Sequence, residues 1–262
     1  MQTSDTVRLA FPTIVYSVIL PAHNEAENLP QVVAEIDLAL QPLGRRYEII
    51  VVDDGSSDDT PQVLRSLSAE HPELRSLRFN RNFGQSAGVD AGFRAARGDI
   101  FVLLDADGQN PPSEIPKLLA ALDDADMVCG WRRVRHDSWV KIVFSKFANL
   151  VRRSILSEAI HDTGCSLKAF RRESVERLKL FHGMHRYLPA LVRMEGWRVR
   201  EIEVAHRPRV HGRSHYGIFN RMLGPMIDLL VVRWMQSRCR PWRMADPSLN
   251  SNVAPIDLRQ AG

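Results

Sequence analysis

Apolar residues in the amino-terminal half of the chain form four short runs, and helical spacing dominates the segments between them. Short apolar runs bounded by turn residues are typical of the buried strands of a parallel sheet. The predicted strands cover residues 16–21, 47–52, 74–79 and 100–104. Helices are predicted over 24–40, with Asn24 as the cap, from Thr60 onward, and over 84–97. The alternation predicts an α/β fold with a doubly wound, mostly parallel sheet.

The carboxyl-terminal half continues this pattern less regularly. A strand is predicted over 126–132, a two-faced helix over 137–156, and a second strand over 167–170. Residues 222–235 are almost continuously apolar, but these 14 residues are too few to span a bilayer, which takes about 20 in a helix. Arginines and tryptophans flank this segment, as is typical of a helix lying in a membrane interface. Packing on the main domain or on a partner subunit is the alternative.

Polar clusters follow three of the predicted strands, at residues 21–25, 52–55 and 105–107. Ligands of doubly wound sheets bind beyond the carboxyl ends of the strands. Asp105 and Asp107 are the most informative pair, because two adjacent negative charges cost free energy unless a cation lies between them. Carboxylate oxygens, with Gln109 as a further oxygen ligand, suit a divalent metal. An acidic turn without a metal is the alternative explanation.

Composition and missing motifs exclude several classes of protein. No G-x-G-x-x-G motif follows the first strand and no P-loop is present, which argues against an NAD-binding or P-loop protein. The 262 residues include 35 Lys and Arg against 31 Asp and Glu, a formal charge of only +4. An acidic sheet edge would repel a nucleic-acid backbone. The three cysteines have no zinc-like spacing, and no run of signal-peptide length opens the chain, so we expect a cytosolic protein.

The three polar clusters together resemble motifs of the inverting family 2 glycosyltransferases of GT-A fold. Among these, the chain is similar to the dolichol-phosphate mannosyltransferases and the bacterial polyprenyl-phosphate glycosyltransferases. The resemblance implies a nucleotide-sugar donor whose base and ribose lie among Pro21, His23, Glu25, Val52 and Asp54. It also implies that Asp105, Ala106, Asp107 and Gln109 meet the donor diphosphate, with magnesium or manganese bound to Asp105, Asp107 and Gln109. His23 departs from the tyrosine that is usual in the family.

The same resemblance implies an acceptor phosphate bound by Arg132, Lys141 and Ser145. A solvated basic helix face is the alternative for Lys141 and Ser145. Asp162 either faces the cleft or caps a turn, and the sequence does not separate these alternatives.

A strongly basic loop follows, with the Gly and Ser content of a mobile lid. The family pattern Arg-x-x-Gly-x-Ser-Lys-Tyr places Arg209 and His215 at positions that reach the donor diphosphate and the acceptor phosphate. His215 stands where the family has lysine, so this phosphate contact is either missing or dependent on pH.

The resemblance predicts transfer of a sugar, with inversion, from a nucleotide-sugar to a polyprenyl (undecaprenyl or dolichyl) phosphate. An ionised phosphate needs no strong general base, and the Gln-x-x-Arg-Trp motif of hydroxyl-using relatives is missing. The predicted organisation is a catalytic domain over 1–220, an interface helix over 221–243 and a disordered tail over 244–262. We expect the protein on the cytosolic face of a membrane, bound to the bilayer or to a membrane-embedded partner.

Two other functions remain open at this stage. One is a family 2 enzyme with a glycan or small-molecule hydroxyl acceptor, using Asp162 or Glu158 as base. The other is a non-catalytic or nucleic-acid-binding module based on the arginine-rich carboxyl-terminal half, which the acidic sheet edge disfavours.

Overall fold

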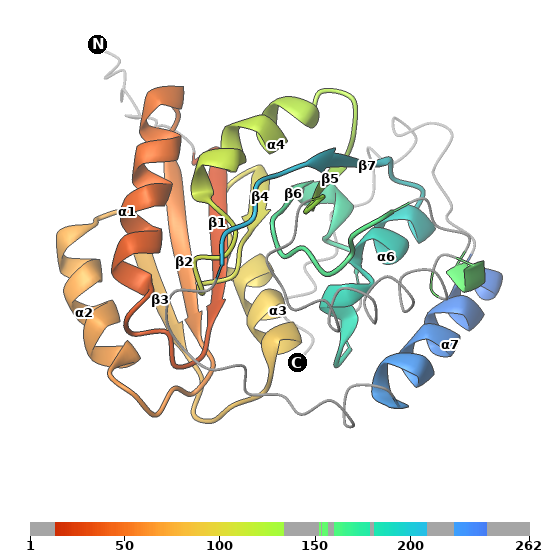
Figure 1. The fold of residues 1–262 in the computed structure, drawn as a ribbon, viewed down its shortest axis with the longest axis horizontal. Helices are drawn as coiled ribbons and strands as arrows, with labels where there is room; N and C mark the ends of the chain where they lie inside the picture. Colours follow the sequence, from red (N-terminus) through yellow and green to blue (C-terminus); the bar gives the residue numbers. More distant parts are fainter. Residues whose placement is uncertain are drawn as a thin grey trace, which may run out of the picture.

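The computed structural model describes residues 14–133, 152, 154–156, 160–178, 181–208 and 223–239. In this part of the chain a sheet of seven strands has the order β3-β2-β1-β4-β6-β5-β7 (Figure 1). Only β6 runs antiparallel to its neighbours β4 and β5 among these described strands. The predicted α/β fold with a mostly parallel sheet is therefore confirmed. The strands are β1 Tyr16–Ala22, β2 Tyr47–Asp53, β3 Leu74–Arg78, β4 Ile100–Leu103, β5 Met127–Trp131, β6 Lys168–Arg171 and β7 Val199–Glu203.

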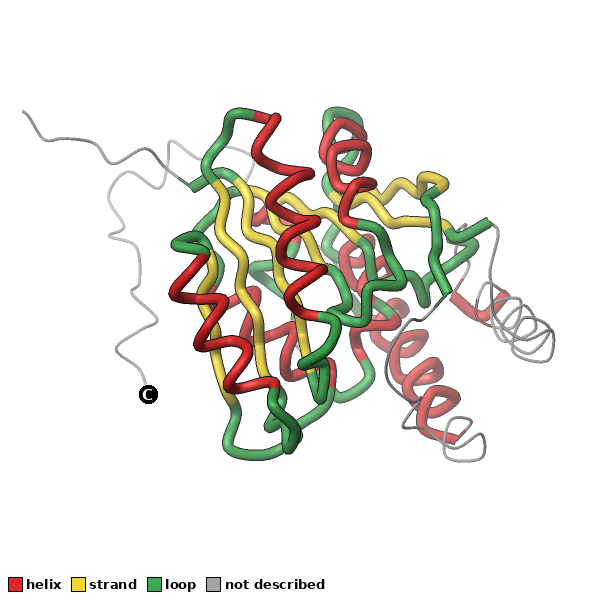
Figure 2. Tube along the Cα trace, turned by 60° about the vertical axis from the view of Figure 1, so that its left-hand side comes forward, coloured by secondary structure: helices red, strands yellow, loops and turns green. Residues whose placement is uncertain are grey.

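Helices cover both faces of the sheet (Figure 2). The described helices are α1 Leu29–Leu40, α2 Thr60–Glu70, α3 Gln85–Ala95, α4 Ile115–Ala121, α6 Leu188–Met194 and α7 Leu223–Arg238. Short 3-10 turns are η1 Gln41–Leu43, η2 Pro112–Glu114, η3 Arg172–Ser174 and η4 Met184–Arg186. Alternate side chains of each strand enter different cores: Val18 and Leu20 of β1 pack with α1, α2 and α4, whereas Ile19 packs with α3, α6 and α7.

Helix α3 lies unusually close to β1. A Cβ atom added to Gly92 would be 2.2 Å from Cγ2 of Ile19, and one added to Gly88 would be 3.1 Å from Cβ of Pro21. The small residues of this segment therefore serve close packing. The contact also brings the amino end of α3 to the carboxyl ends of the central strands.

The prediction that Asn24 caps the first helix is wrong, because α1 begins at Leu29. Asn24 has a positive φ of 58° and forms part of the loop after β1. Its Oδ1 atom accepts hydrogen bonds from the backbone N–H groups of Ser57 (2.9 Å) and Asp58 (3.4 Å). Asn24 therefore joins the loops that follow β1 and β2.

Helix α7 lies within the segment predicted as an interface helix. It buries Leu229 and Val232 in the core beside α6. Five of the seven exposed large apolar side chains in the described part of the chain belong to α7: Met226, Ile227, Leu230, Val231 and Trp234. Within the described residues, no helix has the length and apolarity to cross a membrane.

Candidate functional site

The loops after β1 and β2 form one wall of the candidate site. Pro21 pairs with Val52 in the parallel ladder, and the backbone N–H of Asp54 donates to the carbonyl of Ala22 (2.8 Å). The backbone N–H of Glu25 donates to Oγ1 of Thr60 (3.0 Å). The sheet therefore brings the five predicted nucleotide-side residues together, although their contact with a nucleotide stays a prediction.

Asp54 organises this wall. Its two carboxylate oxygens accept hydrogen bonds from the backbone N–H groups of Phe83 (2.6 Å) and Gly84 (2.8 Å), and its side chain is buried. Its carbonyl lies 2.8 Å from Nδ1 of His23. Asp54 thus anchors the loop before α3, a role that the sequence did not indicate.

Asp105 and Asp107 follow β4 directly, next to the amino end of α3. Oδ1 of Asp105 accepts a hydrogen bond from Nε2 of Gln85 (2.7 Å), and the backbone N–H of Asp105 donates to the hydroxyl oxygen of Ser166 (3.3 Å). Burial, and then the negative charge of Asp107, raise the pKa of Asp105 to about 6. Two crowded carboxylates at a strand end are a donor set that fits a divalent cation.

The protein supplies few ligands for such a cation. In the described residues, no cluster of three or more His, Cys, Asp or Glu side chains could hold a metal. A metal on Asp105 and Asp107 would therefore take its remaining ligands from elsewhere, and diphosphate oxygens suit that role. The backbone N–H of Gln109 donates to Oδ1 of Asp107 (3.1 Å), and its carbonyl accepts from the N–H of Arg207 (2.8 Å). Metal ligation by the Gln109 side chain stays a prediction.

Arg132 stands immediately after β5 and forms a two-pronged ion pair with Asp162. Its Nε and Nη2 atoms donate to the two carboxylate oxygens at 2.7 and 3.0 Å, and its backbone N–H donates to Oδ2 at 3.3 Å. Burial lowers the pKa of Arg132, but the hydrogen bonds and charge of Asp162 outweigh burial and raise it above the ordinary value. Arg132 also interacts electrostatically with Asp105, so it belongs to the same site.

Asp162 has a partner that the sequence did not indicate, and whether it faces the cleft or caps a turn stays open. Both of its carboxylate oxygens bind the Arg132 guanidinium, which makes Asp162 a poor candidate for a general base. The other predicted contacts with the acceptor and the diphosphate (Lys141, Ser145, Arg209 and His215) lie outside the described residues, as does Glu158. The segment 204–208, just before Arg209, is described. It lies beside the metal motif, because the backbone N–H of Arg207 donates to the carbonyl of Gln109.

Four residues of the site were missed by the sequence analysis: Gln85, Ser166, Lys168 and Glu201. Gln85 and Ser166 hold Asp105, while the other two contact the loop that carries Asp162. None belongs to a recognisable sequence motif. Each binds either a residue distant in the sequence or a backbone group, and neither kind of contact leaves a pattern in the sequence. The charge of Lys168 in an apolar strand was the one available signal.

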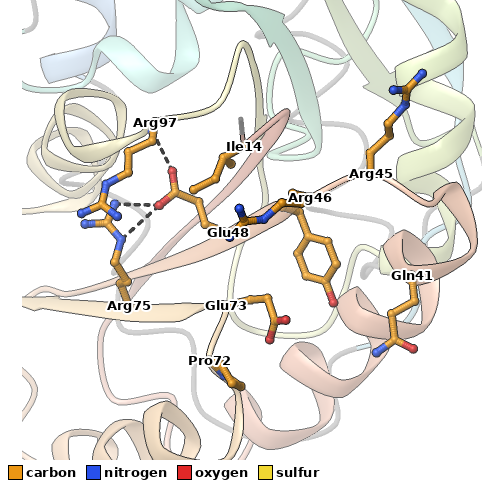
Figure 3. Close-up of a pocket in the computed structure, with 10 residues that line it drawn as sticks. Ile14, Gln41, Arg45, Arg46, Glu48, Pro72, Glu73, Arg75 and Arg97 are labelled. Carbon is orange, nitrogen blue, oxygen red and sulfur yellow. Dashed lines mark hydrogen bonds and ion pairs between the residues drawn. The ribbon is translucent and has the colours of Figure 1, made fainter. Parts of the chain in front are cut away.

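A cavity of about 450 Å³ lies near the amino ends of the strands, at the end of the sheet opposite to the candidate site (Figure 3). It is lined by Ile14, Gln41, Arg45, Arg46, Tyr47, Glu48, Pro72, Glu73, Arg75 and Arg97. Glu48 lies near the amino end of β2, and at about 3.3 Å per residue about 17 Å of strand separates it from Asp53 at the carboxyl end. The carboxylate of Glu48 accepts from Nε and Nη2 of Arg75 (3.0 and 2.7 Å). This cavity is not part of the candidate site.

The comparison with known families agrees with the geometry of the strand ends. Residues 17–179, more than half of the chain, match the family described as glycosyl transferase family 2. The chain belongs to this family. The matched segment of this family 2 glycosyltransferase contains both wall loops, the metal motif and the ion pair between Arg132 and Asp162.

Solved structures with a similar fold include a mannosyltransferase from Pyrobaculum calidifontis, in complex with GDP-Man and Mn2+. It is 23% identical, with a TM-score of 0.62, over 90% of this chain and 67% of that one. Another is glucosyl-3-phosphoglycerate synthase from Mycobacterium tuberculosis, in complex with Mn2+, UDP and phosphoglyceric acid. It is 20% identical, with a TM-score of 0.64, over 88% of this chain and 80% of that one. At these identities the likeness establishes the GT-A fold.

Proposed function

We propose that this family 2 glycosyltransferase transfers a hexose from a nucleotide-sugar to a polyprenyl phosphate, with inversion, at the cytosolic face of a membrane. The exposed apolar face of α7 is the observation that carries the choice of acceptor. A lipid-linked acceptor requires an enzyme that reaches the bilayer, and an enzyme with a soluble acceptor has no need of such a surface.

The donor side of the proposal rests on the metal motif. Asp105 and Asp107 would hold Mg2+ or Mn2+, and the mannosyltransferase and synthase of similar fold were both solved with Mn2+ and a nucleotide or nucleotide-sugar. When bound, the metal would stabilise the negative charge that develops on the departing diphosphate. Gln85 and the Ser166 hydroxyl orient Asp105 for this task through their hydrogen bonds.

The acceptor side rests on Arg132 and on the described carboxylates of the site, among which none is suited to act as a base. Nε and Nη2 of Arg132 bind Asp162, so the Nη1 edge of the guanidinium remains as a donor for a phosphate. Asp162 is occupied by that guanidinium. In the described part of the site we find no carboxylate poised to deprotonate a hydroxyl, whereas an ionised phosphate needs none.

The membrane side rests on α7 and its neighbours. The exposed residues Met226, Ile227, Leu230, Val231 and Trp234 recur at helical spacing and form one face. Arg233 and Arg238 are exposed on the same helix, where they suit anionic headgroups. Nε2 of Gln236 donates to the carbonyl of Leu156 (3.4 Å), so α7 adjoins the end of the segment that carries the predicted acceptor residues.

The proposal is tested by assaying UDP-, GDP- and dTDP-sugars with undecaprenyl phosphate in mixed micelles, in the presence of Mn2+. We expect a glycosyl phospholipid whose anomeric configuration is inverted relative to the donor. Transfer to 3-phosphoglycerate or to a glycan, with none to undecaprenyl phosphate, would overturn the proposed acceptor.

A hydroxyl acceptor is the second candidate. It is favoured by the similarity to glucosyl-3-phosphoglycerate synthase, which was solved with phosphoglyceric acid. The same panel of donors with 3-phosphoglycerate distinguishes the two functions.

A further inference from the structure

A short loop between β5 and β6, residues 162–166, touches both halves of the proposed site. At one end Asp162 binds the guanidinium of Arg132, and at the other end Ser166 hydrogen-bonds the metal-motif residue Asp105. We propose that Glu201 and Lys168 are positioning residues that hold this loop, and so fix Arg132 relative to the metal motif. The inference rests on the proposed role of Arg132.

The loop is largely buried, and its backbone therefore needs partners from the protein. Asp162, Thr163, Cys165 and Ser166 are all at most 7% exposed. Buried N–H and C=O groups without partners are costly, and no regular strand or helix pairs them here. Charged side chains take that role at both ends of the loop.

Glu201, on β7, binds the start of the loop. Its carboxylate accepts hydrogen bonds from the backbone N–H groups of His161 (3.0 Å) and Asp162 (2.8 Å), and lies 2.8 Å from Nδ1 of His161. The His161 ring stacks on Trp131, with centroids 4.7 Å apart and planes at 20°. Since Arg132 follows Trp131, Glu201 fixes both the residue that binds Arg132 and the strand end that carries it.

Lys168, on β6, binds the rest of the loop. The residue is 1% exposed, in the centre of the sheet between Leu103 and Cys129. Its ammonium group donates to the carbonyls of Thr163 (3.4 Å) and Cys165. It also interacts electrostatically with Asp105, so the buried cation and this partly buried carboxylate partly compensate each other.

This arrangement matters because the proposed reaction needs two phosphate-bearing groups at a fixed separation. The metal motif would receive the departing diphosphate, and Arg132 would contact the attacking phosphate. A displacement of about 1 Å between such groups can cost about a hundredfold in rate. Glu201 and Lys168 would then influence turnover without touching either substrate.

The decisive experiment is a double-mutant cycle between Glu201→Gln and Arg132→Ala, read as kcat/KM for undecaprenyl phosphate. One oxygen of Glu201 accepts from the N–H groups of both residue 161 and residue 162, and the other lies against His161; glutamine therefore keeps at most one acceptor, loses the negative charge and turns an NH2 group toward His161. We expect Glu201→Gln to lower kcat/KM about ten- to a hundredfold and to leave the affinities for nucleotide diphosphate and Mn2+ unchanged. In the Arg132→Ala background the same change should cost about twofold or less. Equal losses in both backgrounds would overturn the inference, since Glu201 would then act independently of Arg132.

Glu203→Gln is the matched control. Glu203 lies on the same strand with its side chain 52% exposed, and its carboxylate approaches Arg133 at 3.5 Å. It should behave like the wild type. Gly164→Ala is a second variant, which leaves Glu201 unchanged. It should displace the Arg132 guanidinium, because the added Cβ would lie 3.3 Å from Nη2 of Arg132. Its loss of kcat/KM should likewise be large in the wild-type background and small in the Arg132→Ala background. This comparison can still be made if Glu201→Gln fails to fold.

Lys168→Met tests the other end of the loop, with Lys117→Met as its control. Because Lys168 holds the loop whose Ser166 contacts Asp105, we expect Lys168→Met to weaken Mn2+-dependent binding of nucleotide diphosphate about tenfold, and Lys117→Met to leave it unchanged. Unchanged binding in folded Lys168→Met would overturn the role of Lys168. If the wild type glycosylates 3-phosphoglycerate rather than undecaprenyl phosphate, the proposed acceptor fails, and the same cycle is then measured on 3-phosphoglycerate.

Discussion

Replacing Asp105 with asparagine should make the metal-free protein more stable while it removes the metal site. Burial and Asp107 raise the pKa of Asp105 from 3.8 to about 6, so the ionised form destabilises the folded state. At about 1.36 kcal/mol per pKa unit the ceiling is about 3 kcal/mol, and partial exposure and coupling to Asp107 reduce it to about 1–2 kcal/mol. The amide of the introduced asparagine keeps an oxygen for Gln85, so little else is lost.

The sign of the effect depends on pH. The native state binds this proton more tightly than the unfolded state, so the penalty appears as pH rises from about 4 through about 6. At pH 8 we expect Asp105→Asn to raise the Tm of the metal-free protein by about 2–6 °C, and at pH 4.5 the difference should shrink markedly. Excess Mn2+ should raise the Tm of the wild type at pH 8 and leave that of the variant unchanged.

Thermal unfolding followed by circular dichroism, in EDTA and in excess Mn2+ at both pH values, measures these Tm values. They give the difference between variant and wild type at each pH and the effect of Mn2+ on each protein. A lower Tm for the metal-free variant at pH 8 would refute the argument that crowded carboxylates destabilise the metal-free site. Equal stabilisation of variant and wild type by Mn2+ would refute the placement of the metal on Asp105.

Four further changes have defined outcomes. Asp107→Asn should abolish transfer with the fold intact, and EDTA should inactivate the wild type reversibly; full turnover in excess EDTA would contradict a metal-dependent reaction. Arg132→Lys keeps a charge but loses the two-pronged contact, so kcat/KM for the acceptor should fall nearly as far as in Arg132→Ala. Leu230→Asp with Trp234→Ser should weaken co-sedimentation with anionic vesicles at least about tenfold, without changing nucleotide affinity; equal sedimentation would remove α7 from the interface. If a protonated His215 binds a phosphate, activity should decline as pH rises, and His215→Lys should flatten this decline. Superimposable pH–rate profiles of variant and wild type would show that His215 has no such contact.

The fold was largely predictable because the central strands are buried on both faces. Complete burial requires apolar runs such as those of β1, β2 and β4, and these are visible in the sequence without any partner. The positions of Asp105 and Asp107 at a strand end follow from the same runs. A sheet edge therefore collects its acidic residues in a predictable place.

The contacts that orient these residues were not predictable in the same way. Asn24 looks locally like a helix cap, but its partners are 33 and 34 residues away in the next loop. Glu201 binds the N–H of Asp162 across 39 residues. The bonds of Asn24 depend on the pairing of β1 with β2, and the bond of Glu201 depends on the pairing of β5 with β7 and on the antiparallel insertion of β6. Periodicity reports which face of an element is buried, and it carries no information about which loop lies opposite.

The charges of the described site explain why a diphosphate would need a metal there. Asp105, Asp107 and Asp162 contribute three carboxylates; Lys168 and Arg132 interact electrostatically with Asp105, and Arg132 also pairs with Asp162. Asp162 neutralises Arg132 directly, so Arg132 offers a phosphate a fixed set of hydrogen-bond donors more than a net positive charge. A divalent cation on Asp105 and Asp107 would offset their negative charges where the diphosphate of the donor is expected. It follows that the attraction for a second phosphate has to come from other cations, and the remaining basic positions of the family pattern, Lys141 and Arg209, are the candidates for that role.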